Sequence, residues 1–231
     1  WFFSKNYLKA HHNNQSFLLR TPPNLSRELL ALALKKLLEH HDALRLRFTS
    51  QSAVYPPINS VEDQIALTEV DLSSTPLIEQ AEALEKIATE YQASLNLSTG
   101  PIMRVVMFNL GRDESSLLII IHHLAVDGVS WRIIIPDLAT IYQQIEAQQP
   151  IKLSPKTTAF KNWAVKLNKY AQSDILKQEF DYWINQPWDQ SQPLPTDYDY
   201  TVSDNIVGSV QQVLRKLSIE ETSIMLGSVN E

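Results

Sequence analysis

Apolar residues along this chain form both continuous runs and helical repeats. The clearest run is Leu117–Ile121, which consists only of Leu and Ile and follows a turn signal at Gly111–Glu114. A continuous run of this length predicts a strand buried on both faces, and it is too short to cross a membrane as a helix. A second apolar run, Ile102–Phe108, lies just before the turn. The two runs are therefore predicted to pair as a β-hairpin.

Helical spacing of apolar residues marks several other stretches. Apolar residues recur every three or four positions over Asn24–His41, Thr75–Asn96 and the segment after Gly128, and again around Phe160–Leu167 and Phe180–Trp183. The repeating positions of the first three are Leu25, Leu29, Leu32, Leu37 and Leu38, then Leu77, Ala81, Leu84, Ala88, Tyr91 and Leu95, then Ile134, Leu138, Ile141, Tyr142 and Ile145. The Trp and Tyr residues of the last two helices are predicted to be core residues.

Capping residues and prolines indicate where these predicted helices begin or are interrupted. Asn24 and Thr75 are the predicted N-caps of the first two helices. Ser218, with Glu221 three residues later, forms a capping box that predicts a last helix. Pro136 lies inside the third helix, where a proline costs roughly 3 kcal/mol unless the helix kinks or restarts.

Short strands are predicted where apolar and polar residues alternate. In Leu44–Phe48 three apolar residues, predicted to face the core, alternate with Arg45 and Arg47. Further strand-like runs occur within His11–Leu19, at Ile65–Val70 and, with imperfect alternation, at Ile206–Leu217.

Composition restricts the kind of protein. Apolar residues make up 44% of 231 residues, which is enough for a core, and the net charge of -6 without a run of Lys or Arg argues against a nucleic-acid groove. The absence of cysteine excludes disulfides, zinc–thiolate sites and a Cys nucleophile. No metal site is predicted, because His11 and His12 have no further ligand at a suitable spacing. With neither a membrane-spanning segment nor a signal peptide, we expect a cytoplasmic protein.

Two histidines lie where the central buried strand ends. His122 and His123 directly follow the run, and Asp127 and Gly128 come shortly after them. Because side chains alternate along a strand, one imidazole should face the packed layer and the other the crevice at the strand end, where α/β proteins commonly bind ligands. The alternative is that both histidines are structural and bind backbone groups.

These residues carry a family resemblance. His122–Gly128 reads HHLAVDG, which matches the HHxxxDG signature of the condensation superfamily of nonribosomal peptide synthetases. HHDALRLRF at 40–48 resembles the second motif of that superfamily. The aromatic start Trp1–Phe3 with the later Asn-Gln-Ser segment, and Val129–Ile133 after the signature, resemble its epimerisation branch.

The resemblance implies an α/β two-layer sandwich of the chloramphenicol-acetyltransferase-like type. Residues 1–231 would be the N-terminal lobe of such a domain, with both natural ends and the second lobe lying outside this sequence. The active site lies in a tunnel between the two lobes, and substrates arrive as thioesters on the phosphopantetheine arms of carrier proteins. The implied partners are a peptidyl carrier protein, the C-terminal lobe and neighbouring synthetase domains, and no directly bound cofactor is expected.

The resemblance also implies roles for individual residues. His123 carries the acid/base chemistry, His122 is its structural neighbour, and Asp127 stabilises the loop without carrying a proton. Gly128 marks a position that requires backbone freedom or close approach of another group.

Three further residues are candidates for the site. Ser130 and Trp131, directly after the signature, are substrate-tunnel candidates. Arg45 is a candidate ion-pair partner of Asp127, although a buried pair would need further hydrogen bonds to offset desolvation. The alternative is that Arg45 and Arg47 form the solvated face of their strand.

Three functions are compatible with this resemblance. Epimerisation removes a Cα proton beside a thioester and returns one to the opposite face, which requires two acid/base groups, His123 and a Glu from the second lobe. In a condensation domain the same histidine would assist attack of an amine on a thioester. A non-catalytic lobe that binds carrier proteins is the third possibility. Val129–Arg132 favours epimerisation, and the isolated chain is expected to be inactive.

Overall fold

The computed structural model follows the predicted order of strands and helices. It describes residues 2–5, 7–22, 24–49, 52–56, 66–112, 114–192, 194–199 and 210–227. The chain divides into two units, Trp1–Lys169 and Tyr170–Glu231, and the first contains the sheet and the candidate site. Within the described ranges, no helix combines the length and apolarity needed to span a bilayer.

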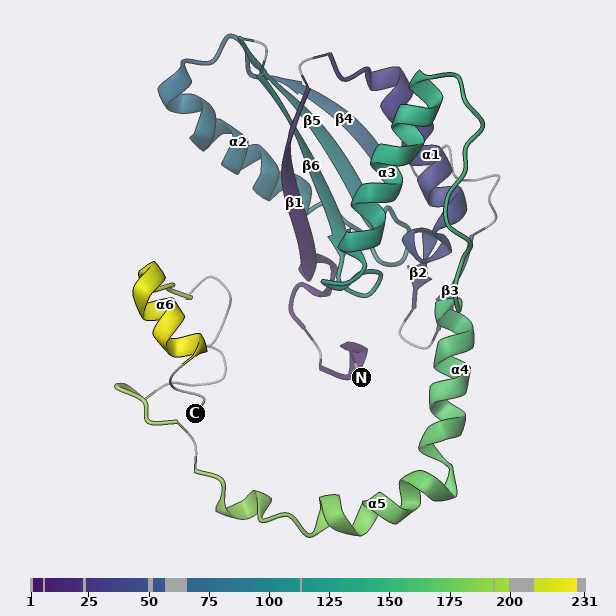
Figure 1. Ribbon diagram of the computed structural model, residues 1–231, viewed down its shortest axis with the longest axis vertical. Helices are drawn as coiled ribbons and strands as arrows, with labels where there is room; N and C mark the ends of the chain where they lie inside the picture. The colour runs from purple at the N-terminus through teal and green to yellow at the C-terminus, as the bar shows by residue number, and fades with distance from the viewer. Residues whose placement is uncertain are drawn as a thin grey trace. The chain divides into compact units, whose positions relative to one another are not determined.

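A four-stranded sheet forms the centre of the first unit (Figure 1). Its strands, in spatial order, are β1 (Asn14–Thr21), β6 (Glu114–His122), β5 (Met103–Gly111) and β4 (Ala66–Asp71). β5 and β6 pair antiparallel with Val105 opposite Ile119, which confirms the predicted hairpin. β1 pairs antiparallel with the other edge of β6, and β4 runs parallel to β5. Because β6 is an inner strand, its run Leu117–Ile121 is buried on both faces.

Helices cover both faces of this sheet (Figure 1). α1 (Arg27–His40) and α3 (Trp131–Glu146) pack on one face, and α2 (Leu77–Gln92) packs on the other. Successive strand side chains point to opposite faces, so the residues of β5 and β6 divide between two apolar clusters. The α1 and α3 side includes Leu34, Leu37, Val105, Ile119, Ile121, Ile134 and Ile141, and the α2 side includes Val106, Phe108, Leu118 and Ile120. The predicted α/β class is confirmed, and α2 adds a helical layer to the two that were predicted.

Neither of the first two predicted N-caps is correct. α1 begins after Ser26, whose hydroxyl accepts a hydrogen bond of 3.2 Å from a backbone N–H of the first turn, so Asn24 is not its cap. α2 begins after Pro76 without a side-chain cap, so Thr75 does not serve as one. The fixed φ of a proline favours a helix start by itself.

Packing rather than local propensity determines which residues of α1 are buried and that α3 continues past its proline. The buried residues of α1 follow a helical repeat from Leu30, and Leu32, predicted to be core, is exposed. α3 continues through Pro136, although the proline removes the N–H that would bond to the Arg132 carbonyl. Four side chains of α3 are buried, each worth roughly 1.5–3 kcal/mol. Together they outweigh the roughly 3 kcal/mol that an internal proline costs.

The predicted strand Leu44–Phe48 is mostly a turn. A 3-10 turn, η3 (Asp42–Arg45), is followed by the two-residue strand β2 (Arg47–Phe48), which pairs with β3 (Ala53–Val54). Its apolar residues Leu44, Leu46 and Phe48 are buried as predicted. Arg45 and Arg47 are buried as well, so their assignment to a solvated strand face was wrong.

The remaining helices are α4 (Phe160–Ala171), α5 (Asp174–Ile184), the short turn η6 (Trp188–Gln190) and α6 (Ile219–Leu226). The capping box of α6 is confirmed, since Ser218 Oγ accepts from the Glu221 N–H at 3.1 Å and the Glu221 carboxylate accepts from the Ser218 N–H at 2.8 Å. Trp163, Tyr182 and Trp183 are exposed, which corrects their prediction as core residues.

Other predictions fall at the edges of the described ranges. Val210–Leu217 has no regular secondary structure, which contradicts the strand predicted over Ile206–Leu217. A strand requires a partner ladder, and the imperfect alternation of this run offers no clear face for one. Residues 206–209 lie outside the described part of the chain, as do Trp1 and Ile65.

Candidate active site

Two imidazoles with opposite surroundings lie at the end of β6. His122, the last residue of the strand, is fully buried, whereas the next residue, His123, is exposed. This is the alternation that the strand predicted. Only the exposed ring of His123 can therefore meet a substrate at this strand end.

Both ring nitrogens of His122 are already used by the fold. Its Nε2–H donates to the Ala10 carbonyl at 2.8 Å, and its Nδ1 accepts from the Leu124 N–H at 3.1 Å. The ring of Phe2 packs edge-on against it, with centroids 5.6 Å apart. Burial lowers the pKa of His122, so the ring is held neutral in the folded chain. His122 is a structural group without a nitrogen left for a substrate.

The buried His122 predicts a loss of stability in acid. The folded chain keeps this ring neutral, while the unfolded chain takes up a proton as the pH falls through the ordinary histidine pKa of 6.5. The free energy of unfolding should thus be constant above that pH and decrease below it. Urea unfolding at about pH 7.5 and about pH 5.5 measures the difference, and His122→Asn should reduce it. An unchanged difference in the variant would contradict this assignment.

The hydrogen bonds of His123 define the tautomer of its neutral ring. Its Nδ1 lies 2.9 Å from the Val126 carbonyl oxygen. A carbonyl only accepts hydrogen bonds, so Nδ1 carries the proton of the neutral ring, and Nε2 has the lone pair. This nitrogen lies on the exposed side of the strand end, 3.2 Å from the side-chain amide nitrogen of Gln15. His123 can therefore accept a proton at Nε2.

Trp131 is buried and bonds to the side chain that contacts this nitrogen. It is only 4% exposed, stacks on Phe17 at a centroid distance of 4.7 Å, and donates its Nε1–H to Gln15 Oε1 at 2.8 Å. Within this lobe the indole is therefore part of the core, and its place in a tunnel between two lobes stays a prediction. Sequence reasoning did not select Gln15, although the Asn-Gln-Ser segment that contains it was part of the resemblance.

Asp127 and Ser130 hold the loop between β6 and α3. Asp127 Oδ1 accepts from the Ser130 N–H at 2.8 Å and from the Ser130 hydroxyl at 2.7 Å, while Ser130 Oγ accepts from the Asp127 N–H at 3.2 Å. Hydrogen bonds from the side chain and then the backbone of Ser130 lower the pKa of Asp127. An ionised carboxylate at the start of α3 also complements the helix dipole. These contacts support a loop-stabilising role for both residues.

Arg45 does not pair with Asp127. Its guanidinium donates to the backbone carbonyls of Leu38 and Glu39 in the last turn of α1, where unpaired carbonyls attract a cation. Arg47 donates to other carbonyls, to Thr99 O at 3.1 Å and to Leu46 O at 2.8 Å. Both the ion pair and the solvated-face alternative are thus corrected.

Gly128 shows neither of the constraints expected for it. A Cβ built there would meet no atom within 4 Å among the described residues, and its φ is not in the positive range. The fold of this chain therefore does not by itself require glycine at this position.

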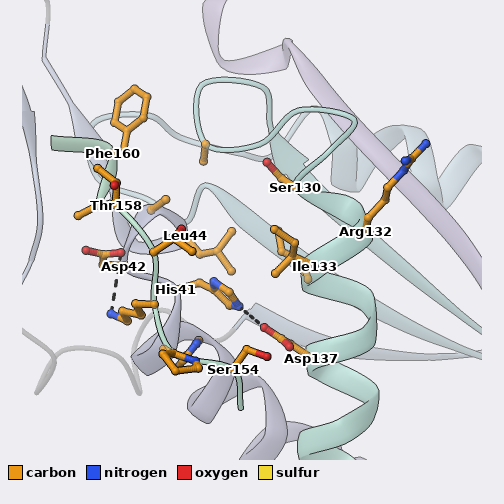
Figure 2. A pocket seen from close by; sticks show the side chains of 18 of the residues that line it. His41, Asp42, Leu44, Ser130, Arg132, Ile133, Asp137, Ser154, Thr158 and Phe160 are labelled. Carbon is orange, nitrogen blue, oxygen red and sulfur yellow. Dashed lines mark hydrogen bonds and ion pairs between the residues drawn. The ribbon is translucent and has the colours of Figure 1, made fainter. Parts of the chain in front are cut away.

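A cavity of about 630 Å³ lies beside the loop (Figure 2), and His123 is not among the residues that line it. It is lined by the end of α1, the first turns of α3 and the segment 154–160, and Ser130 lies on its wall. His41 Nε2 and Asp137 Oδ2 meet across it at 2.8 Å and tie α1 to α3. The His-His-Asp motif at 40–42 thus supports the helices rather than the exposed imidazole.

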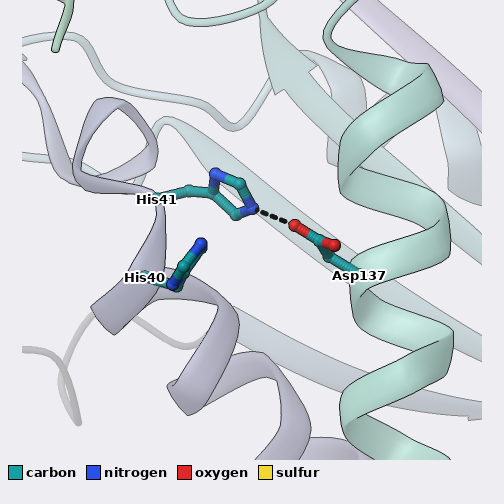
Figure 3. A group of neighbouring side chains, drawn as sticks. All are labelled: His40, His41 and Asp137. Atoms are coloured by element: carbon teal, nitrogen blue, oxygen red, sulfur yellow. Dashed lines mark hydrogen bonds and ion pairs between the residues drawn. The ribbon is translucent and has the colours of Figure 1, made fainter. Parts of the chain in front are cut away.

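One group of side chains in the described ranges has the composition of a metal site (Figure 3). One ligand atom from each of His40, His41 and Asp137 falls within 4.8 Å of the other two. Burial and then the neighbouring His41 lower the pKa of His40, which keeps its ring available as a ligand at neutral pH. Three such ligands could hold a divalent cation. The His41–Asp137 hydrogen bond alone also accounts for the arrangement.

Solved structures define the class of protein. The chain is similar to the epimerization domain from the third module of tyrocidine synthetase B, with a TM-score of 0.79 and 36% identity over 87% of this chain and 46% of that one. It shares the fold of the condensation enzyme VibH, with a TM-score of 0.58 and 23% identity over 79% and 42% of the two chains. The fold is therefore the chloramphenicol-acetyltransferase-like fold of nonribosomal peptide synthetase domains.

Sequence comparisons place the chain in a family. The family model described as Condensation domain matches residues 1–223. The chain is 38% identical over 201 residues to tyrocidine synthase 2 of Brevibacillus parabrevis, which covers 86% of this chain and 6% of that protein. It is 34% identical over 233 residues to gramicidin S synthase 1 of Brevibacillus brevis, covering 100% and 21%. The chain belongs to the Condensation domain family, and it spans only a small part of these relatives.

Proposed function

We propose that this chain is the N-terminal lobe of a nonribosomal peptide synthetase epimerisation domain. The main support is the exposed imidazole of His123, whose Nδ1 contact leaves Nε2 as the acceptor of the neutral ring, in a chain that is 36% identical to a solved epimerization domain. A neutral imidazole removes protons well near pH 7. His122 is fully buried and both its nitrogens bond to the backbone, whereas His123 is exposed, so His123 is the proposed base at this strand end.

The reaction is an exchange of the Cα proton of an aminoacyl or peptidyl thioester. His123 Nε2 takes the proton, and the electron pair of the broken C–H bond delocalises into the thioester carbonyl. A second acid/base group, from the C-terminal lobe of the domain, returns a proton to the opposite face, and the L residue becomes D. Proton exchange with solvent then resets both groups, since His123 releases the proton that it took and the second group takes one up.

The substrate is carried rather than free in this proposal. It is attached to the phosphopantetheine arm of a peptidyl carrier protein, which docks on the complete domain beside neighbouring synthetase domains. No directly bound cofactor takes part. The exposed position of His123 supports this arrangement, because a substrate tethered to an arm requires an open approach to the base.

The test is a stereochemical assay of the complete domain, both lobes included, with its carrier protein loaded with an L-aminoacyl thioester. In D₂O we expect the D form to appear together with one deuterium at Cα, detected by chiral chromatography and mass spectrometry. An acceptor amine on a second carrier protein is supplied in a parallel reaction. Peptide-bond formation without D product or deuterium would identify a condensation domain, and binding of the carrier protein without either reaction would identify a docking lobe.

A further inference from the structure

Gln15 and His123 lie on the same face of the sheet. Gln15 is directly opposite Ile121 in the β1–β6 ladder, and the His123 N–H continues the ladder to the Asn13 carbonyl at 2.8 Å. Residues two apart along a strand share a face, so Gln15 is the diagonal cross-strand neighbour of His123. The ladder itself brings this amide to the imidazole.

The indole of Trp131 fixes which way the Gln15 amide faces. An indole N–H can only donate, so the atom 2.8 Å from Trp131 Nε1 is the Gln15 oxygen. The amide nitrogen then faces His123, whose Nε2 lies 3.2 Å away and has the lone pair that accepts its N–H. Three hydrogen bonds run in one direction, from Trp131 to Gln15, from Gln15 to His123 and from His123 to the Val126 carbonyl.

We propose that Gln15 is a positioning residue for the proposed epimerisation: held by the Trp131 indole, its amide orients the His123 ring and keeps Nε2 unprotonated until the substrate arrives. This inference rests on the proposed function. The N···N distance of 3.2 Å is at the long end of the hydrogen-bond range, so a substrate C–H can displace the amide.

The same arrangement disfavours the protonated ring. After proton transfer Nε2 becomes a donor and faces the amide donor of Gln15, and a rotation of the amide would leave the buried Trp131 N–H without an acceptor. Among the described residues, the charge of His123 acts on His122 and Asp127, and the hydrogen bonds of these two side chains go to other groups than Gln15.

The test compares variants of the complete domain in the deuterium-exchange assay over a range of pH. Gln15→Leu should lower kcat about tenfold with little change in KM, because substrate contacts remain while the ring loses its orientation. Gln15→Glu places a carboxylate on the imidazole and stabilises the imidazolium. The acid limb of its pH–rate profile should therefore move to higher pH by about one unit or more.

Trp131→Phe keeps the core packing but releases the Gln15 amide to rotate. It should move the acid limb in the same direction as Gln15→Glu, by a smaller amount. Ser16→Ala, on the same strand but with its side chain on the other face, is the matched control and should behave as the wild type. If the wild-type domain does not epimerise, the proposed function fails. If it does, the inference is overturned when Gln15→Leu is fully active or when Gln15→Glu loses activity without a shift in the profile.

Discussion

His123→Ala in the complete domain should abolish conversion of an L-aminoacyl thioester to the D form. General acid–base catalysis by a side chain contributes about a hundredfold to ten-thousandfold to a rate, and a loss within that range is expected. The ring is exposed and, among the described residues, hydrogen-bonds only to Val126 and Gln15, so the free energy of unfolding should change by less than about 0.5 kcal/mol. Chiral analysis of the released product measures the first effect, and urea unfolding measures the second.

The matched control is His12→Ala. His12 is also an exposed histidine, and it lies outside the hydrogen-bonded group around His123. Its variant should retain both the activity and the stability of the wild type. Full activity in His123→Ala would remove this imidazole from the catalytic role.

Gly100→Ala should destabilise the chain by about 3 kcal/mol or more. Gly100 has a φ of +85°, where an L side chain is strained by roughly 1–3 kcal/mol. In addition, the new Cβ would overlap the guanidinium of Arg47. Arg47 is buried and donates to the Leu46 and Thr99 carbonyls, so moving it leaves polar groups unpaired at about 1–3 kcal/mol each. Urea unfolding of the chain measures the loss.

Gly128→Ala is the comparison for that variant. Gly128 has open space where a Cβ would lie and no positive φ, so its variant should stay within about 0.5 kcal/mol of the wild type. Equal stability of the two alanine variants would show that Arg47 adapts without cost and would contradict the prediction for Gly100.

The elements defined by strict periodicity could be predicted from the sequence. The hairpin of β5 and β6 followed from two apolar runs on either side of a turn, and the opposite directions of His122 and His123 followed from the two-residue repeat of a strand. Both patterns are local, and packing did not override them. The family resemblance was confirmed by the match to the Condensation domain family.

Contacts between residues far apart in the sequence could not be predicted from local patterns. Arg45 and Arg47 alternate with apolar residues as exposed charges do, yet both are buried and donate to backbone carbonyls at the end of α1 and beyond it. Gln15 was missed because its contact with His123 depends on a ladder between segments 108 residues apart. Trp131 was selected as a candidate site residue from the sequence. Its hydrogen bond to Gln15 could not be predicted, because it depends on the register of β1 in the sheet.

β1 is an edge strand of the described sheet, and it brings Gln15 to His123. Edge strands detach at a lower free energy than inner ones, since they are held by one ladder instead of two. The proposed activity is thereby coupled to the local detachment of β1. In mild denaturant we expect this activity to be lost while most of the sheet is still folded.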